Sequence, residues 1–331
     1  MQNTKQRKRC DKHFKTPKTV IELLCAVCSK GANLLLNIGP KPDGSIPQEA
    51  VQIAEALGDW MHQNSEAIYD TVASPFAADF SFGWATQKGN HLYLLMKEPR
   101  QYIEILGLNN KVLSAEALTG KAAAVQQTQS KLCLDLSKVS FNDTVTAIKL
   151  TLDGKPQVAE GLFQQESDTI SLPCCACKIK KGEHRTELPI FALAMDREIG
   201  EYWENSSTEI RVNLNGSVEY WTSEQDSIFW EFEVVESGQY EVVLYTATSK
   251  YQPWTGGHKV RVRCKDNDIA ATLREDVLPH GVNRRYFSET GSILGQVTLE
   301  SGDCTLLLSA EQINPKDPAG LCVTQMVLRK M

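Results

Sequence analysis

After Asn64 the sequence returns again and again to an alternation of side chains with a period of two. The stretches with this pattern are 92–96, 103–105, 132–136, 148–152, 228–234, 240–244, 260–264 and 304–308. Such alternation is typical of strands with one buried and one solvated face. Turn residues such as Asp153-Gly154 and Ser237-Gly238 separate the stretches. The pattern therefore predicts small antiparallel sandwiches, with 228–234 and 240–244 paired as a hairpin.

The residues before Asn64 follow a different pattern. Thr16 and Pro17 form a helix start, and Gly31 can end that helix. A continuous apolar run, Leu34–Ile38, then suits a strand buried on both faces. A Gly/Pro-rich loop follows, and a second helix is expected from Pro47. The order helix, strand, loop, helix is typical of an α/β barrel or a doubly wound sheet.

These segments predict a mainly β protein with a small α/β piece. An eight-fold barrel takes ~250 residues, so the first seventy residues can hold only the end of one. We expect the end of a (β/α)8 barrel followed by two antiparallel, jelly-roll-like β-sandwiches. The expected units are a basic tail at 1–15, the barrel end at 16–71, a sandwich at 72–158, a linker at 159–189 and a second sandwich at 190–331.

Charge and hydropathy limit the classes of partner. The formal net charge is -6, whereas phosphate binding needs a basic field, so we expect no nucleic-acid partner. No apolar run approaches the ~20 residues needed to cross a bilayer. The start of the chain is basic and has no apolar segment behind it, so we predict no signal peptide. The sequence leaves the compartment and the oligomeric state open.

Ten cysteines are present, and two groups stand out. Cys25 and Cys28 form a CxxC, but both have the spacing of core positions in a helix. Cys174, Cys175 and Cys177 form a CCxC without a nearby second pair of ligands, whereas zinc needs four. We therefore predict no metal and no cofactor, with a metal at the CCxC as the alternative.

One segment carries a specific family resemblance. Residues 33–40 read NLLLNIGP, and residues 43–47 read DGSIP. Together with Trp60 and with Glu66-Ala67-Ile68-Tyr69, they resemble the end of the catalytic barrel of family 29 α-L-fucosidases over residues 16–71. Ser65 stands where the family has glycine. Residues 226–242 more weakly resemble the galactose-binding-like modules attached to some of these enzymes.

The resemblance implies a parent activity and also implies that the catalytic residues lie outside the matched segment. These enzymes hydrolyse terminal α-L-fucose by a retaining mechanism that uses two carboxyl groups. The family's nucleophile and acid/base come from barrel strands that precede the matched segment, so we predict no catalytic residue in this chain. The expectation is a truncated, inactive family member. The family is typically lysosomal or secreted, and its partners are fucosylated glycans or other carbohydrates.

A few aromatic residues suggest an alternative, non-catalytic function. Tyr251 and Trp254 lie in a Pro/Gly-rich loop between predicted strands, with His258 next to them and Trp221 before another strand. Sugars stack on exposed aromatic rings and bind nearby polar groups. These residues predict a carbohydrate-binding sandwich, although a loop tryptophan can also cover the end of a core. Asn37 is expected at the rim of the barrel pocket, as structural support.

Overall fold

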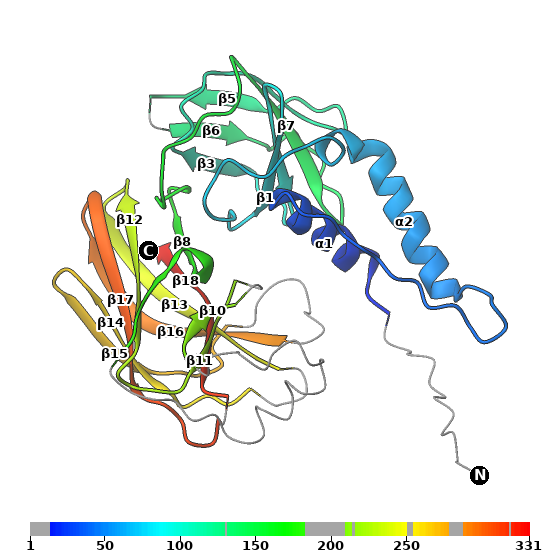
Figure 1. Ribbon diagram of the computed structural model, residues 1–331. Coiled ribbons are helices and arrows are strands. Elements are labelled where there is room, and N and C mark those ends of the chain that lie inside the picture. The colour runs from blue at the N-terminus through cyan, green and yellow to red at the C-terminus, as the bar shows by residue number, and fades with distance from the viewer. Residues whose placement is uncertain are drawn as a thin grey trace, which may run out of the picture.

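The computed structural model describes residues 14–129, 131–182, 209–213, 216–249, 254–277, 287–317 and 319–331. Two β regions follow one another along the chain, and two helices lie against the first of them (Figure 1). The mainly β class predicted from the alternation is confirmed, with several antiparallel sheets. None of the described helices combines the length and the apolar character needed to cross a membrane.

Helix α1 (Pro17–Ser29) begins where the sequence predicted. The hydroxyl of Thr16 accepts a hydrogen bond from the Thr19 amide, and Pro17 occupies the first turn. Gly31, at φ +69°, ends the helix in the left-handed region, where its amide bonds to the Cys28 carbonyl. Both ends of α1 are therefore fixed by the residues that flank it.

Helix α2 (Gln48–Asn64) continues into the short 3-10 helix η1 (Ser65–Ala67). Of the apolar side expected for this helix, Trp60 is the residue that becomes buried. Its indole Nε1 donates to the Val145 carbonyl at 2.7 Å. The start of α2 extends away from the first β region (Figure 1), so Trp60 anchors the end of the helix that touches the sheet.

The apolar run Leu34–Ile38 forms no strand, contrary to expectation. Leu35 is 85% exposed, and Leu36 and Ile38 are also exposed. A strand of a parallel sheet needs hydrogen-bonding neighbours on its edges. No described residue pairs with this run, and the segment forms neither helix nor strand between α1 and α2.

The first β region contains a four-stranded and a three-stranded antiparallel sheet, ordered β1-β2-β7-β4 and β3-β6-β5. Its strands are β1 (Gly83–Lys88), β2 (His91–Met96), β3 (Tyr102–Leu106), β4 (Val112–Ala117), β5 (Ala124–Gln127), β6 (Lys131–Asp135) and β7 (Thr146–Leu152). Leu92 and Leu94 face the core between the sheets. Tyr93 and Leu95 face the other way and pack with Ile21 and Trp60 of the helices. One sheet is therefore covered on both faces.

The segment 159–189, expected to be a linker, contributes strands to the second β region. Strand β8 (Thr169–Pro173) pairs with β18 (Leu321–Lys330), and β9 (Lys178–Lys180) pairs with β12 (Ser227–Val234). The short helix η2 (Cys174–Ala176) joins β8 to β9. The alternation in β8 is brief, and only pairing with distant strands buries its Ile170 and Leu172.

The second β region is a sandwich of two larger sheets. One has the order β10-β11-β18-β13-β16, with β8 also on β18, and the other has the order β15-β14-β17-β12-β9. The remaining strands are β10 (Arg211–Val212), β11 (Val218–Trp221), β13 (Gly238–Ser249), β14 (Lys259–Cys264), β15 (Asn267–Thr272), β16 (Phe287–Leu299) and β17 (Gly302–Gln312). The expected hairpin of β12 and β13 is wrong, because these strands pair in different sheets. The turn at Ser237 carries the chain across the core instead of along a sheet edge.

Candidate functional site

The loop before β14 holds the aromatic residues predicted to bind sugars. Trp254 is half-buried against the core of the second β region, and its Nε1 donates to Thr246 Oγ1 at 3.1 Å. A Cβ on Gly256 would lie 2.7 Å from the Trp254 ring, so the loop needs glycine there. Trp254 thus covers the end of the core and keeps part of its surface accessible. Tyr251 lies outside the described residues.

Trp221 and His258 occupy more enclosed positions. Trp221 has no exposed surface, and its Nε1 donates to the Ser223 carbonyl. His258 is 3% exposed, and its Nδ1 accepts a hydrogen bond from the Asn314 amide at 3.1 Å. Its Nε2 lies 3.4 Å from Asp317 Oδ2. In this conformation neither ring presents a face on which a ligand could stack.

Asn37, predicted to support a barrel pocket, is exposed in the segment between α1 and α2. The helices on either side of that segment pack with the first β region, whereas Trp254 packs against the core of the second. The structure therefore does not describe one site that contains both the barrel-rim residue and the aromatic loop.

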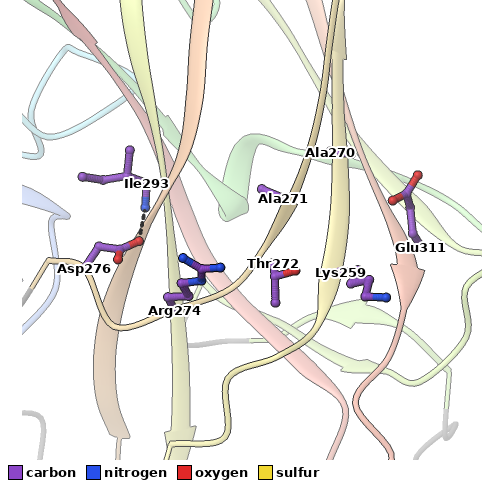
Figure 2. A pocket seen from close by; sticks show the side chains of 8 residues that line it. All are labelled: Lys259, Ala270, Ala271, Thr272, Arg274, Asp276, Ile293 and Glu311. Atoms are coloured by element: carbon purple, nitrogen blue, oxygen red, sulfur yellow. Dashed lines mark hydrogen bonds between the residues drawn. The ribbon is translucent and has the colours of Figure 1, made fainter.

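A hollow of about 570 Å³ lies on the second β region, close to the aromatic loop. The residues that line it are Lys259, Ala270, Ala271, Thr272, Arg274, Asp276, Ile293 and Glu311 (Figure 2). The aromatic loop is tied to this lining through Leu273, which follows Thr272. The Leu273 carbonyl accepts from the Gly257 amide, and the Leu273 amide donates to the His258 carbonyl, both at 2.9 Å.

Among the residues that the structure describes, the acidic side chains around this hollow have hydrogen-bond partners in the protein, whereas the basic ones do not. Glu311 accepts a hydrogen bond from Arg261, and Asp276 accepts from the Ile293 amide at 3.0 Å. Within the described part of the chain, the side chains of Lys259 and Arg274 have no hydrogen-bond or ion-pair partner. Ser292 Oγ holds the backbone of Arg274 through both its amide and its carbonyl. The charged side chains of the lining that remain unpaired in the described residues are thus both cations.

A second hollow, of about 280 Å³, lies beside the junction of the two β regions. Its most unusual lining residue is Glu166, which is 4% exposed. The two carboxylate oxygens accept from the Ser81 amide at 2.6 Å and the Ser81 hydroxyl at 2.7 Å. Burial nevertheless raises the pKa of Glu166 to about 7. Arg100 donates to the same hydroxyl and forms an ion pair with Asp168.

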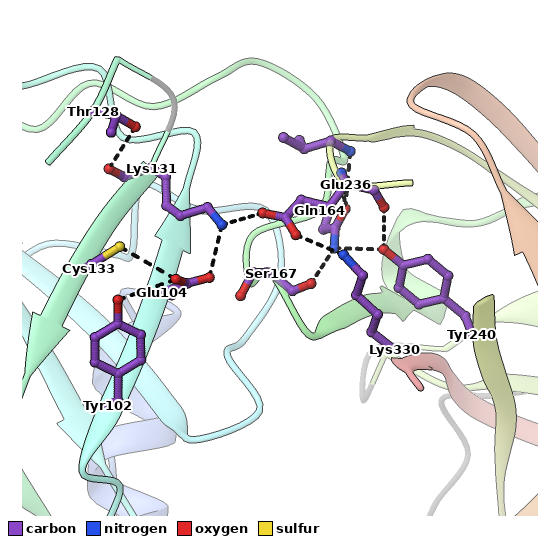
Figure 3. Close-up of polar contacts among 11 residues, drawn as sticks. Tyr102, Glu104, Thr128, Lys131, Cys133, Gln164, Ser167, Glu236, Tyr240 and Lys330 are labelled. Atoms are coloured by element: carbon purple, nitrogen blue, oxygen red, sulfur yellow. Dashed lines mark hydrogen bonds and ion pairs between the residues drawn. The ribbon is translucent and has the colours of Figure 1, made fainter. Parts of the chain in front are cut away.

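A polar network continues from this hollow across the junction (Figure 3). Lys131 forms ion pairs with Glu104 of the first β region and Glu236 of the second. The hydrogen bond to Glu236 raises the pKa of Lys131, so the lysine stays charged. Gln164 accepts from the amides of Val235 and Glu236. The carboxylates lining this hollow are all held by protein donors, as expected for structural contacts.

Sequence reasoning missed Lys259, Arg274, Asp276 and Glu311 as a lining set. One signal was available, because Lys259, Arg261 and Arg263 alternate along β14 and mark a cationic outer face. Nothing local indicated that Arg274 comes from beyond the next strand to the same place. No group of three metal-ligating side chains occurs within the described ranges.

Comparisons with known proteins confirm the predicted family resemblance. Residues 4–66 match the family model described as Alpha-L-fucosidase. Tissue alpha-L-fucosidase of Bos taurus is 33% identical over 84 residues, which cover 25% of this chain and 18% of that protein. Plasma alpha-L-fucosidase of Rattus norvegicus is 40% identical over 58 residues, or 18% of this chain and 13% of that protein. These matches span less than a fifth of the length of the curated relatives.

A solved structure covers much more of the chain. The alpha-L-fucosidase from Vibrio sp. strain EJY3 superposes on 95% of this chain and 51% of its own, with a TM-score of 0.69 and 21% identity. At that identity the superposition shows a shared fold. Together with the sequence matches at 4–66, it relates this chain, over part of its length, to the α-L-fucosidase family.

Proposed function

We propose that this chain belongs to an α-L-fucoside-hydrolysing system as a non-catalytic portion, and that it does not itself cleave fucosides. The observation that carries this proposal is the state of Leu34–Ile38. This run has the sequence of a barrel strand and lies inside the family match, yet it is exposed and unpaired among the described residues. Such a run is expected where a barrel strand lacks its neighbours.

The carboxyl groups described here support the same proposal. A retaining glycosidase needs two carboxyl groups about 5–5.5 Å apart and open to the sugar. At the junction hollow, Glu166 is held by Ser81 and Glu104 by Lys131. At the larger hollow, Glu311 is held by Arg261.

An assay with an aryl α-L-fucoside on the purified chain tests this proposal. We expect no release of the aryl group above the buffer rate, while a family enzyme assayed in parallel gives a signal. Turnover above background that scales with protein concentration would overturn the proposal.

The larger hollow favours a second candidate function, the binding of an acidic carbohydrate. Among the described residues, Lys259 and Arg274 line it without a hydrogen-bond or ion-pair partner, and the half-buried Trp254 lies in the adjoining loop. Guanidinium and ammonium groups bind carboxylate or sulfate, and an aromatic ring stacks on a sugar face. This arrangement suits a sugar that carries an anionic group.

A glycan array with neutral, carboxylated and sulfated sugars tests the second function. We expect binding of the anionic classes, and at least a tenfold weaker signal for the variant Lys259→Ala/Arg274→Ala. Lys265→Ala, at an exposed position outside the hollow, is the matched control and should bind like the wild type. Absence of a wild-type signal, or equal loss in the control, would refute the candidate.

A further inference from the structure

The CCxC motif lies where the chain crosses between the two sheets of the second β region. Strand β8 pairs with β18 in one sheet, and β9 pairs with β12 in the other. Helix η2, which starts at Cys174, makes the crossing within a few residues. A covalent bond at this point would brace one of the short connections between the two sheets.

The backbone brings Cys174 and Cys177 close together. The Cys177 amide donates to the Cys174 carbonyl at 3.1 Å and closes a tight turn. Residues three apart in such a turn have Cα atoms within about 7 Å, and disulfides span Cα separations of about 4.4–6.8 Å. The turn therefore places the Cα atoms of Cys174 and Cys177 in the range of separations that a disulfide spans.

The two thiols differ in burial and acidity. Cys174 is fully buried, and burial raises its pKa. Cys177 is only partly buried, and the neighbouring Cys174 thiol lowers its pKa. The thiolate is the nucleophile in disulfide exchange, so Cys177 is the more reactive partner. Cys174 lies behind it in the position of a resolving thiol.

We propose that Cys174 and Cys177 form a reversible dithiol–disulfide pair that exchanges with small disulfides such as oxidised glutathione. The Cys177 thiolate attacks one glutathione sulfur, the glutathione disulfide breaks, and one glutathione thiolate leaves. The Cys174 thiol then loses its proton and attacks Cys177 Sγ, and the second glutathione leaves. Two cysteine thiols become one disulfide, one glutathione disulfide becomes two thiols, and the two protons pass to glutathione.

Two other sets of cysteines provide internal controls. Cys175 is exposed but lies between the paired residues, so it tests whether exposure alone decides the reaction. Cys264 and Cys304 lie on the neighbouring strands β14 and β17, and both are buried in the core. They test whether two cysteines on adjacent strands form a disulfide when neither thiol is accessible. We expect neither set to form the disulfide under mild conditions.

Peptide mass mapping of the whole reduced chain tests the proposal. The protein is equilibrated with oxidised and reduced glutathione, quenched with acid, alkylated in denaturant and digested. We expect one internal disulfide linking Cys174 and Cys177, with Cys175, Cys264 and Cys304 alkylated. The variant Cys175→Ser should keep the disulfide. Cys174→Ala should instead leave glutathione on Cys177.

Three outcomes would overturn the proposal. The first is full alkylation of Cys174 and Cys177 at glutathione ratios that oxidise a thioredoxin-like CxxC peptide. The second is a disulfide that uses Cys175, and the third is equal oxidation of the Cys264–Cys304 pair. If Cys174→Ala fails to fold, the wild-type map and Cys175→Ser still decide the matter.

Discussion

The helical segment and the second β region both pack on the first β region, but through different kinds of contact. The helices share an apolar core with the outer face of one sheet, where Ile21 and Trp60 meet Tyr93. The second β region is joined by polar groups, including Lys131 with Glu236 and Gln164 with Tyr240. Apolar contacts respond mainly to changes in side-chain volume, whereas the polar junction should respond to pH and salt.

The largest effect is expected from Trp60→Ala. Trp60 is 5% exposed, and truncation of a buried tryptophan costs about 3 kcal/mol or more. The helices should detach before the β regions unfold, since the buried Trp60 of α2 joins the helix to Val145, the residue before β7. Amide exchange should show faster exchange of residues 17–64. Trp60→Phe keeps most of the ring and should lose about 1 kcal/mol. Equal protection of helices and sandwiches in the alanine variant would contradict this view.

The junction should respond to pH through Glu166. Its pKa is about 7 in the folded protein, against an ordinary 4.5. The folded state therefore binds this proton more tightly, and stability should rise by about 2 kcal/mol as pH falls from 7 to 5. The pKa of Glu104 is lowered mainly by the Ser167 hydrogen bond, and that of Glu236 by Lys131 despite burial. Both stay ionised in this window.

Glu166→Gln isolates this effect. The variant is uncharged at every pH, so urea unfolding should lose the rise in stability between pH 7 and pH 5 that the wild type shows. If stability changes with pH equally in both proteins, Glu166 is not the source of that change.

A smaller effect is expected from Lys131→Met, which removes the cation between Glu104 and Glu236. The lysine side chain is 28% exposed, so solvent screening limits the loss to about 1 kcal/mol. The difference from wild type should shrink at high salt. Lys138→Met, at an exposed position, is the control and should change stability little. A loss of stability that does not depend on salt would indicate that Lys131 acts through its packing and not through its charge.

The smallest effect is expected from Leu35→Ser, because Leu35 is 85% exposed. Exposed substitutions usually change stability by less than about 0.5 kcal/mol. Leu92→Ala, at a fully buried leucine of the first β region, should cost about 3 kcal/mol in the same denaturation experiment. A similar cost at Leu35 would show that the run Leu34–Ile38 is covered in solution.

Local patterns predicted some elements well. Thr16, Pro17 and Gly31 marked the ends of α1, because capping depends on a few neighbouring residues. The phase of Leu92, Leu94 and Met96 likewise indicated which side chains face the core. These features depend only on residues that are close to one another in the sequence.

Other expectations failed because they depended on partners far away in the sequence. The β12–β13 hairpin is replaced by a crossing between sheets, and the expected linker supplies β8. Local alternation carries no information on which strand pairs with which. The residues predicted to bind sugars show the same limit, since Trp254 keeps an accessible surface while Trp221 is enclosed.

The sequence by itself determined the mainly β class, the helix ends and the family resemblance of residues 16–71, since each follows from short-range residue patterns. Tertiary structure alone decided that Leu34–Ile38 stays unpaired, that Lys259 and Arg274 line one hollow, and that Cys174 and Cys177 lie at the two ends of a tight turn. The physical reason is that hydrogen-bond pairing and burial are set by neighbours in space, which a single strand or loop does not specify.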